Sequence, residues 1–242
     1  MDEKSTLGVE GQQSTGGDLT DQAASQLTNS ALLAVAGGFL DGFTYVGHGH
    51  VFANAMTGNV VLLGISCFSR ELGSGLRHLP PILMFVLGVS VAKALEMPAA
   101  KRRLRHPHLA ALIIQIAFLA TLAFLPESTP DVWFTTSIAF AASVQVETFR
   151  KVHGRPFNST FTTGNLRTFA ENCFAWLFAG GGDEARSAAW DFGVICFAFF
   201  AGAAAGGVAT MRLGNRGLWI DVLLLGIVVV RVRPRAAVTA AS

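Results

Sequence analysis

The sequence is poor in charge. Asp, Glu, Lys and Arg make up only 14% of its 242 residues, while 51% are hydrophobic. A soluble domain carries roughly 25% charged residues. This composition therefore argues against an ordinary soluble domain and indicates a membrane protein.

Cysteine is also scarce, and the common signatures of catalysis are missing. Cys67, Cys173 and Cys196 are isolated in apolar surroundings, so there is no CxxC pair, zinc spacing or haem attachment motif. The sequence has no phosphate-binding glycine loop, HExxH motif or serine nucleophile elbow. We therefore expect no metal, no cofactor, no catalytic set and no nucleic-acid partner.

Long apolar runs are present instead. A helix needs about 17–25 mostly apolar residues to span a bilayer, and residues 109–125 contain no charge at all. We predict eight apolar helical segments: 31–47, 56–68, 80–96, 109–125, 132–148, 161–180, 188–211 and 217–230.

Two of these segments differ from the rest. Segment 56–68 is too short to span alone, and segment 161–180 is amphipathic because it carries Arg167, Glu171 and Asn172. We predict that both are half-helices packed inside the protein. The expected fold is all-α, a polytopic membrane bundle of about six transmembrane helices plus two short half-helices.

Polar tails flank this expected bundle. Residues 1–30 hold five acids and one Lys and are rich in Ser, Thr, Gln and Gly, which is typical of a disordered tail. We expect a transmembrane domain over 31–231, divided into repeats at 31–125 and 132–231. Residues 232–242 form the expected C-terminal tail.

Basic clusters predict the orientation. The Lys/Arg-rich stretch 101–105 should be cytoplasmic, and the acidic loop 127–131 should be outside. Six spans then leave the basic stretch 231–235 and both termini in the cytoplasm. Eight spans would leave that stretch outside, against the rule.

One short motif occurs twice. Segments 56–59 (Met-Thr-Gly-Asn) and 162–165 (Thr-Thr-Gly-Asn) share a Thr-Gly-Asn core, 106 residues apart, and an acid lies 18 residues before each Asn. These acids are Asp41 and Glu147. Three spans per half would invert the second copy relative to the first, as in many secondary transporters. Four spans per half would make the copies parallel.

A second match supports the two halves. Phe85-x-x-Gly88-x-x-x-Ala92 resembles Phe199-x-x-Gly202-x-x-x-Gly206. Small residues four apart let helices approach closely in lipid. The face with the two glycines would also suit a homo-oligomer.

The acids and the repeated motifs are candidate binding residues. An ionisable group inside an apolar helix is expensive and usually functional, and the start of a half-helix offers free backbone N–H groups. Alternatively, each motif only caps a half-helix whose backbone needs partners inside the membrane. The candidate residues are Asp41, Thr57, Gly58, Asn59, Gln145, Glu147, Thr163, Gly164 and Asn165.

Other polar residues have simpler interpretations. Asp191 and Asp221 each lie close to a Trp near a helix end, which is typical of the interfacial belt. His48 and His50 lie in a glycine-rich loop, and we expect both to be exposed.

The motifs also carry a family resemblance. Residues 37–64 read GGFLDGFTYVGHGHVFANAMTGNVVLLG. This run resembles the opening of the YoaK-type membrane proteins, the DUF1275 or UPF0700 family, and segments 143–150 and 161–166 agree with the second half. The resemblance covers roughly 31–231 and implies about six membrane helices, with an activity that is largely uncharacterised. Many relatives have Gln-Asn where this sequence has Gln145-Val146, so any role of that Asn is missing or moved here.

Three classes of function fit these features. The first is a small transporter or permease-like protein with a polar site near the bilayer midplane. The second is an integral-membrane enzyme acting on a lipophilic substrate, with Asp41 or Glu147 as general acid or base. The third is a structural or assembly protein. The expected partners are the lipid bilayer and a small molecule or ion that the sequence does not identify.

Overall fold

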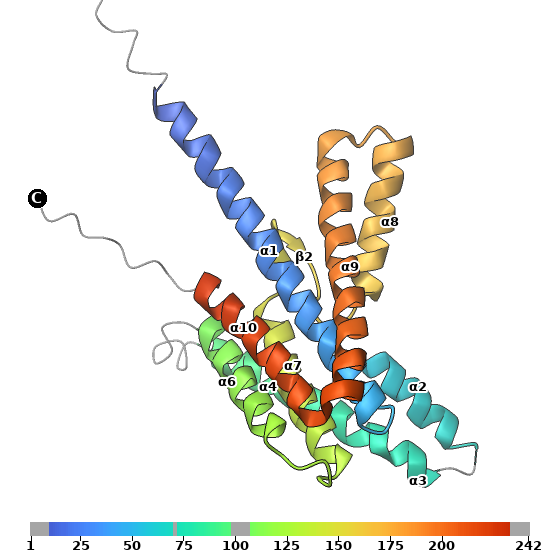
Figure 1. Cartoon of the computed structure of the whole chain (residues 1–242). Helices are drawn as coiled ribbons and strands as arrows, with labels where there is room; N and C mark the ends of the chain where they lie inside the picture. Colours follow the sequence, from blue (N-terminus) through green and yellow to red (C-terminus); the bar gives the residue numbers. More distant parts are fainter. Residues whose placement is uncertain (1–9, 70–71, 98–106, 233–242) are drawn as a thin grey trace, which may run out of the picture.

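The computed structural model describes residues 10–69, 72–97 and 107–232, so the predicted basic stretch 101–105 lies outside it. The elements in order are α1 (Glu10–Gly47), α2 (Met56–Ser66), α3 (Leu72–Gly75), the 3-10 turn η1 (Leu76–His78), α4 (Leu79–Glu96), α6 (Pro107–Ala123), α7 (Asp131–Thr148), β1 (Lys151–Val152), β2 (Arg155–Pro156), α8 (Thr163–Phe178), α9 (Gly182–Leu213), the 3-10 turn η2 (Gly214–Gly217) and α10 (Leu218–Val232) (Figure 1). Each of the eight predicted apolar segments coincides with a helix.

The all-α character is therefore confirmed. By length and composition, three described helical stretches could cross a membrane: Gln26–Gly47, Gly73–Leu95 and the continuous run Gly182–Val232. Met56–Ser66 and Leu109–Ala123 are shorter apolar helices. The chain is a helical membrane protein.

Helix α1 begins earlier than the sequence predicts. It starts at Glu10, inside the segment expected to be a disordered tail, so the described part of that segment is helical. Further along the helix, Leu27 and Ala31 pack against a small core that contains Phe192. A helix anchored in this way extends readily, because each added residue closes one more backbone hydrogen bond.

Helices α1 and α9 cross at very short range. A Cβ added to Gly38 would lie 2.0 Å from the carbonyl oxygen of Phe199, and one added to Gly206 would lie 2.0 Å from that of Phe39. The two backbones therefore touch, which only glycine permits. Gly202 faces α1 in the same manner, so within one chain α1 already covers the face that we expected to suit a homo-oligomer.

Helices α4 and α7 form a second close pair. A Cβ on Gly88 would lie 1.9 Å from the hydroxyl oxygen of Ser143 and 2.6 Å from the carbonyl oxygen of Phe140. Gly88 and Gly202 are the glycines that the sequence comparison aligned. Each lies against the first helix of the other half of the chain.

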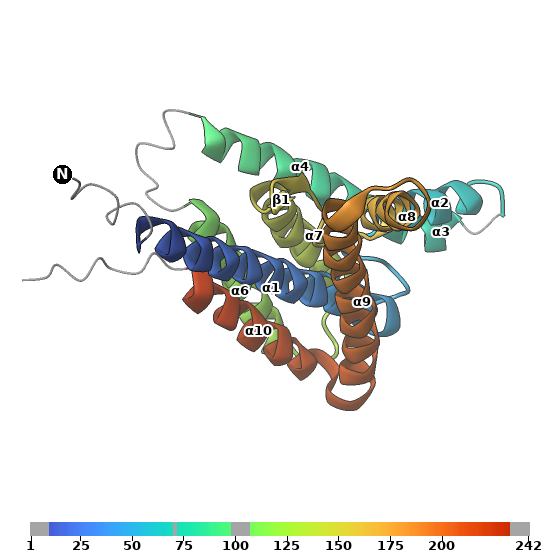
Figure 2. The ribbon, with the colours of Figure 1, turned by 90° about the horizontal axis from the view of Figure 1, so that it is seen from above.

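Helices α1, α6, α7 and α10 surround the main apolar core (Figure 2). Phe39, Leu112, Phe134 and Leu225 are completely or almost completely buried there. The cavity described below lies where α1 meets the starts of α2 and α8.

A short hairpin after α7 was not predicted. Strands β1 and β2 pair antiparallel around His153 and Gly154, both of which have positive φ (48° and 78°). Two such central residues are typical of a tight type I′ turn. His is a less usual first residue than Asn or Asp, which is why the sequence pattern did not reveal the turn.

The glycine crossing leads to a first prediction. Gly206→Ala should lower the thermal unfolding temperature, with a loss of about 1–3 kcal/mol from overpacking, because the new Cβ meets the Phe39 backbone. Gly226→Ala on α10 is the matched control, since a Cβ there has no neighbour within 4 Å. Unfolding in detergent should separate the two variants, and equal midpoints would contradict the close contact.

Candidate functional site

The Asp41 carboxylate caps the segment that leads into α2. Its Oδ1 accepts hydrogen bonds from the backbone N–H of Asn54 at 2.7 Å and of Ala55 at 3.4 Å. Asp41 is only 5% exposed. Because backbone N–H groups at a helix start lack helical partners and carry partial positive charge, this carboxylate fixes the start of α2 against α1.

Asn54 also belongs to this cluster, and the sequence analysis did not identify it. Its Nδ2 donates to the carbonyl oxygen of Gly37 at 2.8 Å, and it is 1% exposed. Its Oδ1 is buried without a hydrogen-bond partner among the described residues. Thr160, at the same 106-residue offset, likewise has a buried hydroxyl without a partner there. The 106-residue offset between Asn54 and Thr160, equal to that between the two motifs, is the sequence signal that could have identified this pair.

The two motif asparagines make the same pair of contacts. Asn59 Oδ1 accepts from the backbone N–H of Phe52 at 3.1 Å, and its Nδ2 donates to the Phe52 carbonyl at 2.7 Å. Asn165 does the same with Asn158, at 3.1 and 2.6 Å. Each side chain thus binds both backbone groups of the residue seven positions earlier. Asn59 Oδ1 also lies 3.2 Å from Nδ1 of His78.

The starts of both half-helices open onto one cavity of about 700 Å³. Thr57 of α2, Thr163 and Gly164 of α8, and Asp41 of α1 line it. From this region α2 and α8 run toward opposite ends of the molecule (Figure 1). The apolar part of the wall consists mainly of aromatic side chains, namely Tyr45, Phe52, Phe85, Phe161 and Phe199.

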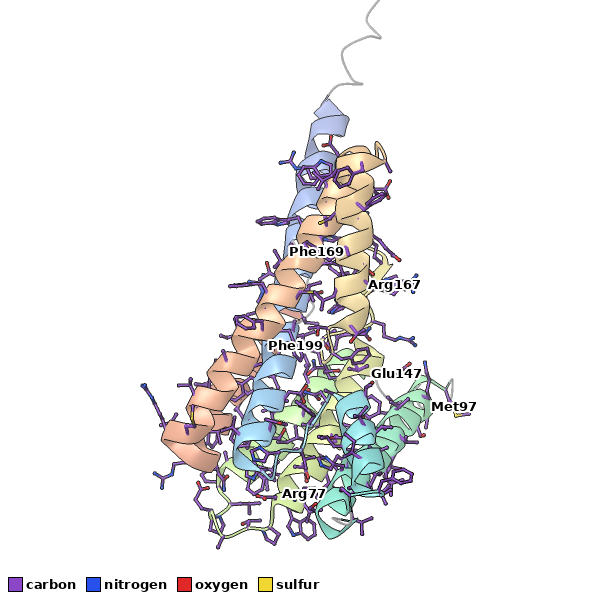
Figure 3. All side chains as sticks on the ribbon, turned by 90° about the vertical axis from the view of Figure 1, so that its right-hand side faces the viewer. Arg77, Met97, Glu147, Arg167, Phe169 and Phe199 are labelled. Carbon is purple, nitrogen blue, oxygen red and sulfur yellow. The ribbon has the colours of Figure 1, made fainter. Side chains whose placement is uncertain are left out.

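The acid in the second half has a different environment. Glu147 is 8% exposed; its Oε1 forms ion pairs with Lys93 and, at 2.9 Å, with Arg150. Figure 3 shows it beside the last part of α4, on the side of Met97. Gln145 Nε2 donates to the Ser159 hydroxyl at 2.9 Å.

Four of the nine candidate residues therefore share the cavity: Asp41, Thr57, Thr163 and Gly164. Gly58, Asn59, Gln145, Glu147 and Asn165 are not part of its lining. The two asparagines bind the backbone of their own loops, which matches the structural alternative for those residues.

The expectation that His48 is exposed was wrong. It is 5% exposed, its Nδ1 lies 3.0 Å from Oδ1 of Asp131, and its ring stacks on Phe134 at a centroid distance of 4.1 Å. Burial lowers the pKa of His48, against the opposing effect of the Asp131 carboxylate. His50 remains exposed and binds the Tyr45 carbonyl.

Two acids with an interfacial interpretation are buried within the protein. Asp191 is 3% exposed and lies 2.6 Å from Nδ1 of His153 and 3.9 Å from Arg155, because the unpredicted hairpin covers it. Asp221 is completely buried, since α10 packs on α1 and α6. Neither of its carboxylate oxygens has a hydrogen-bond partner within the described ranges.

The asparagine contacts lead to a second prediction. Asn165→Ala would leave the part-buried N–H and C=O of Asn158 without these partners, which costs up to about 1–3 kcal/mol. The thermal unfolding midpoint of the Asn165→Ala variant in detergent should therefore be lower than that of the wild type. Asn172→Ala is the control, because Asn172 only donates to Thr168 one turn earlier in α8. Equal midpoints for the two variants would mean that Asn165 does not hold this loop.

Comparison with known proteins confirms the family resemblance. Residues 30–231 match the model of a family described as a protein of unknown function, DUF1275. The chain is 27% identical over 159 residues to the UPF0700 transmembrane protein YoaK of Bacillus subtilis (strain 168), an alignment that covers 64% of this chain and 71% of that protein. No solved structure matches. Because the family model covers most of the sequence, the chain belongs to the DUF1275 family of transmembrane proteins.

Proposed function

We propose that this protein is a small transporter or permease-like protein whose substrate site is the cavity between the starts of α2 and α8. The observation that carries the proposal is the common lining by Asp41 and by residues of both Thr-Gly-Asn motifs. Helix starts inside a membrane protein form ready sites for polar groups, because their N–H groups and dipoles point at the ligand.

The proposal includes two inverted repeats of three spanning helices, α1, α4 and α6 followed by α7, α9 and α10. Reciprocal packing supports this arrangement: α1 packs on α9 as α7 packs on α4, and α8 lies against α9 as α2 lies against α4. The matching asparagine contacts of α2 and α8 support it further.

We also propose that both termini are cytoplasmic. Arg231 Nε near the end of α10 donates to Oδ1 of Asn29 in α1 at 2.9 Å. Asn29 lies near the start of the apolar span Gln26–Gly47 of α1, and α10 ends beside this part of α1 (Figure 1). An even number of spans agrees with this placement.

The cavity chemistry suits a small polar solute with both donors and acceptors. The Asp41 carboxylate offers an acceptor, and the Thr57 and Thr163 hydroxyls offer donors and acceptors. The aromatic wall provides apolar contact area. A strongly charged solute would need a counter-charge, and Asp41 is the one carboxylate among the described lining residues, which include no Lys, Arg or His.

Polar contacts join the helices on both sides of this site. Near the ends of α4 and α7, Lys93 and Arg150 bind Glu147. Where α1 ends and α7 begins, His48 binds Asp131. In a transporter with alternating access, these contacts are suited to hold each side closed in turn.

Access to the cavity provides a test that does not depend on the substrate. In a background with the three native cysteines replaced by Ala, Thr57→Cys and Thr163→Cys should react with a small water-soluble methanethiosulfonate in proteoliposomes. Leu119→Cys, in the fully buried core, should not react. If both cavity positions are as unreactive as the core position, the motifs are packed and the proposal is wrong.

Transport can be measured by stopped-flow light scattering of proteoliposomes with a panel of small polar solutes. Asp41→Asn keeps the shape but removes the charge, and should reduce any protein-dependent flux at least about tenfold, since a hydrogen bond to a charged group contributes about 1.5–3 kcal/mol. Glu171→Gln, at an exposed position on α8, is the control. Equal flux through both variants would contradict the role of Asp41.

A further inference from the structure

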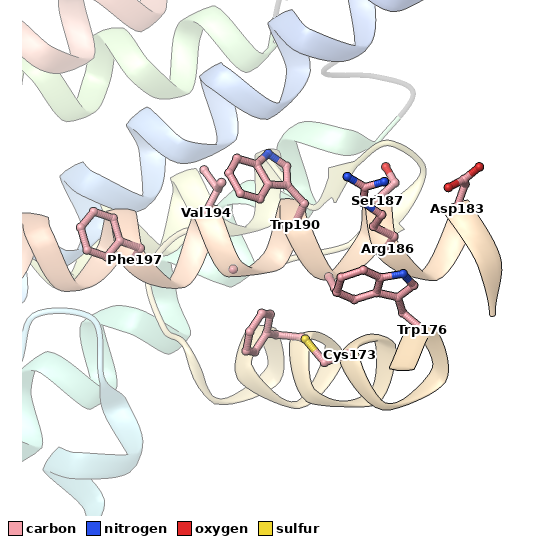
Figure 4. A pocket seen from close by; sticks show the side chains of 11 residues that line it. Cys173, Trp176, Asp183, Arg186, Ser187, Trp190, Val194 and Phe197 are labelled. Atoms are coloured by element: carbon pink, nitrogen blue, oxygen red, sulfur yellow. The ribbon is translucent and has the colours of Figure 1, made fainter. Parts of the chain in front are cut away.

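A second and larger cleft lies between α8 and α9, with a volume of about 930 Å³ (Figure 4). Its lining differs from that of the cavity at Asp41. Asp183, Arg186 and Ser187 line one end, in the first turns of α9. Phe169, Trp190 and Phe197 line the remainder, and Trp190 and Phe197 are 69% and 70% exposed.

The two charges at this end of the cleft are free to meet a ligand. The Arg186 guanidinium lies over the ring of Trp176, 5.9 Å from its centroid. Among the described residues no acid pairs with Arg186 and no base pairs with Asp183, whereas Arg155 and Arg167 both have acidic partners. Three positions apart on a helix, Asp183 and Arg186 lie on the same face.

The length of the cleft along α9 is close to the thickness of the hydrocarbon part of one membrane leaflet. The apolar run that includes α9 begins at Gly182, so Arg186 is about 6 Å along it at 1.5 Å per residue. From Arg186 to Phe197 the same rise gives about 16 Å. This length is close to the thickness of one leaflet, which is half of a hydrocarbon core of about 30 Å.

The polarity along the cleft also follows that of a lipid. Charges occur only at the end near the loop before α9. Trp176 and Trp190 lie next along the walls, and Trp is enriched at the membrane–water interface. Beyond them the side chains are apolar, with Phe169, Val194 and Phe197 as the main surfaces.

We propose that this cleft binds one zwitterionic aminophospholipid. The Arg186 guanidinium binds the phosphate, with Ser187 able to donate its hydroxyl, and Asp183 binds the ammonium group. One acyl chain lies along the aromatic wall toward Phe197. Arg suits this task because its planar donors match phosphate oxygens and it stays charged, and its stacking on Trp176 keeps the side chain at the entrance.

Native mass spectrometry of the full chain, purified in detergent and supplied with dioleoyl-phosphatidylethanolamine, tests this assignment. We expect one tightly held lipid per chain. Arg186→Gln should lower its occupancy about tenfold, as expected for loss of a charged hydrogen bond. Arg212→Gln, at an exposed position near the other end of α9, should retain the wild-type occupancy.

A second variant tests the apolar part independently. A Cβ on Gly193 would lie 3.1 Å from a ring carbon of Phe169, so Gly193→Leu should fill the cleft and exclude the acyl chain while leaving Arg186 in place. Unchanged thermal midpoints would show that both variants are folded; if Gly193→Leu is unfolded, Val194→Trp replaces it as the blocking variant.

Three outcomes would overturn the proposal. The first is wild-type occupancy in Arg186→Gln or in the blocking variant. The second is equal or stronger retention of phosphatidylglycerol, which has no ammonium group for Asp183. The third is a dimer that the blocking variant converts to a monomer with no change in bound lipid, which would assign the cleft to a second copy of the chain.

Discussion

The structure depends on one constraint: backbone groups exposed by a broken helix inside a membrane protein must find partners within the protein. Helices α2 and α8 both begin inside the molecule and leave such groups free. Asn59 and Asn165 each bind the N–H and the C=O of a loop residue, and Asp41 binds the N–H groups just before α2. Because these hydrogen bonds satisfy the exposed backbone groups, the starts of α2 and α8 can both lie beside one cavity. The glycine contacts that bring α1 against α9 place Asp41 in its wall.

The two equivalent acids have different partners in the two halves of the chain. Asp41 and Glu147 occupy equivalent positions in the sequence, yet Asp41 binds backbone N–H groups while Glu147 binds Lys93 and Arg150. A Glu paired with two cations is neutralised by its neighbours, so it does not add charge to the cavity. The site is therefore asymmetric even though the helices around it pack reciprocally. In the proposed transporter, a single acid defines the charge that a substrate meets.

Much of the helical fold could be predicted from sequence, because apolar runs report directly on helices in lipid. The repeated Thr-Gly-Asn motif also identified the two helix starts, and three motif residues with Asp41 line the cavity. What the sequence did not reveal depends on contacts between distant segments. His48 is buried where its ring stacks on Phe134, and it binds Asp131, 83 residues away. Asp191 binds His153 of a hairpin 38 residues before it. Asp221 looks interfacial beside Trp219, but α1 and α6 cover it. No local pattern encodes such burial.

The α8–α9 pair connects the two proposed sites. Gly164 and Phe199 line the cavity at Asp41, whereas Phe169 and Phe197 line the cleft assigned to lipid. Under the two proposals, the same two helices contact the solute through one set of side chains and a lipid through another. A ligand shifts a conformational equilibrium only by its difference in affinity between the two states. Since rocking of α8 and α9 would reshape both surfaces together, a lipid that fits one state of the cleft would also favour one state of the cavity. Lipid occupancy and solute affinity should then be coupled in both directions.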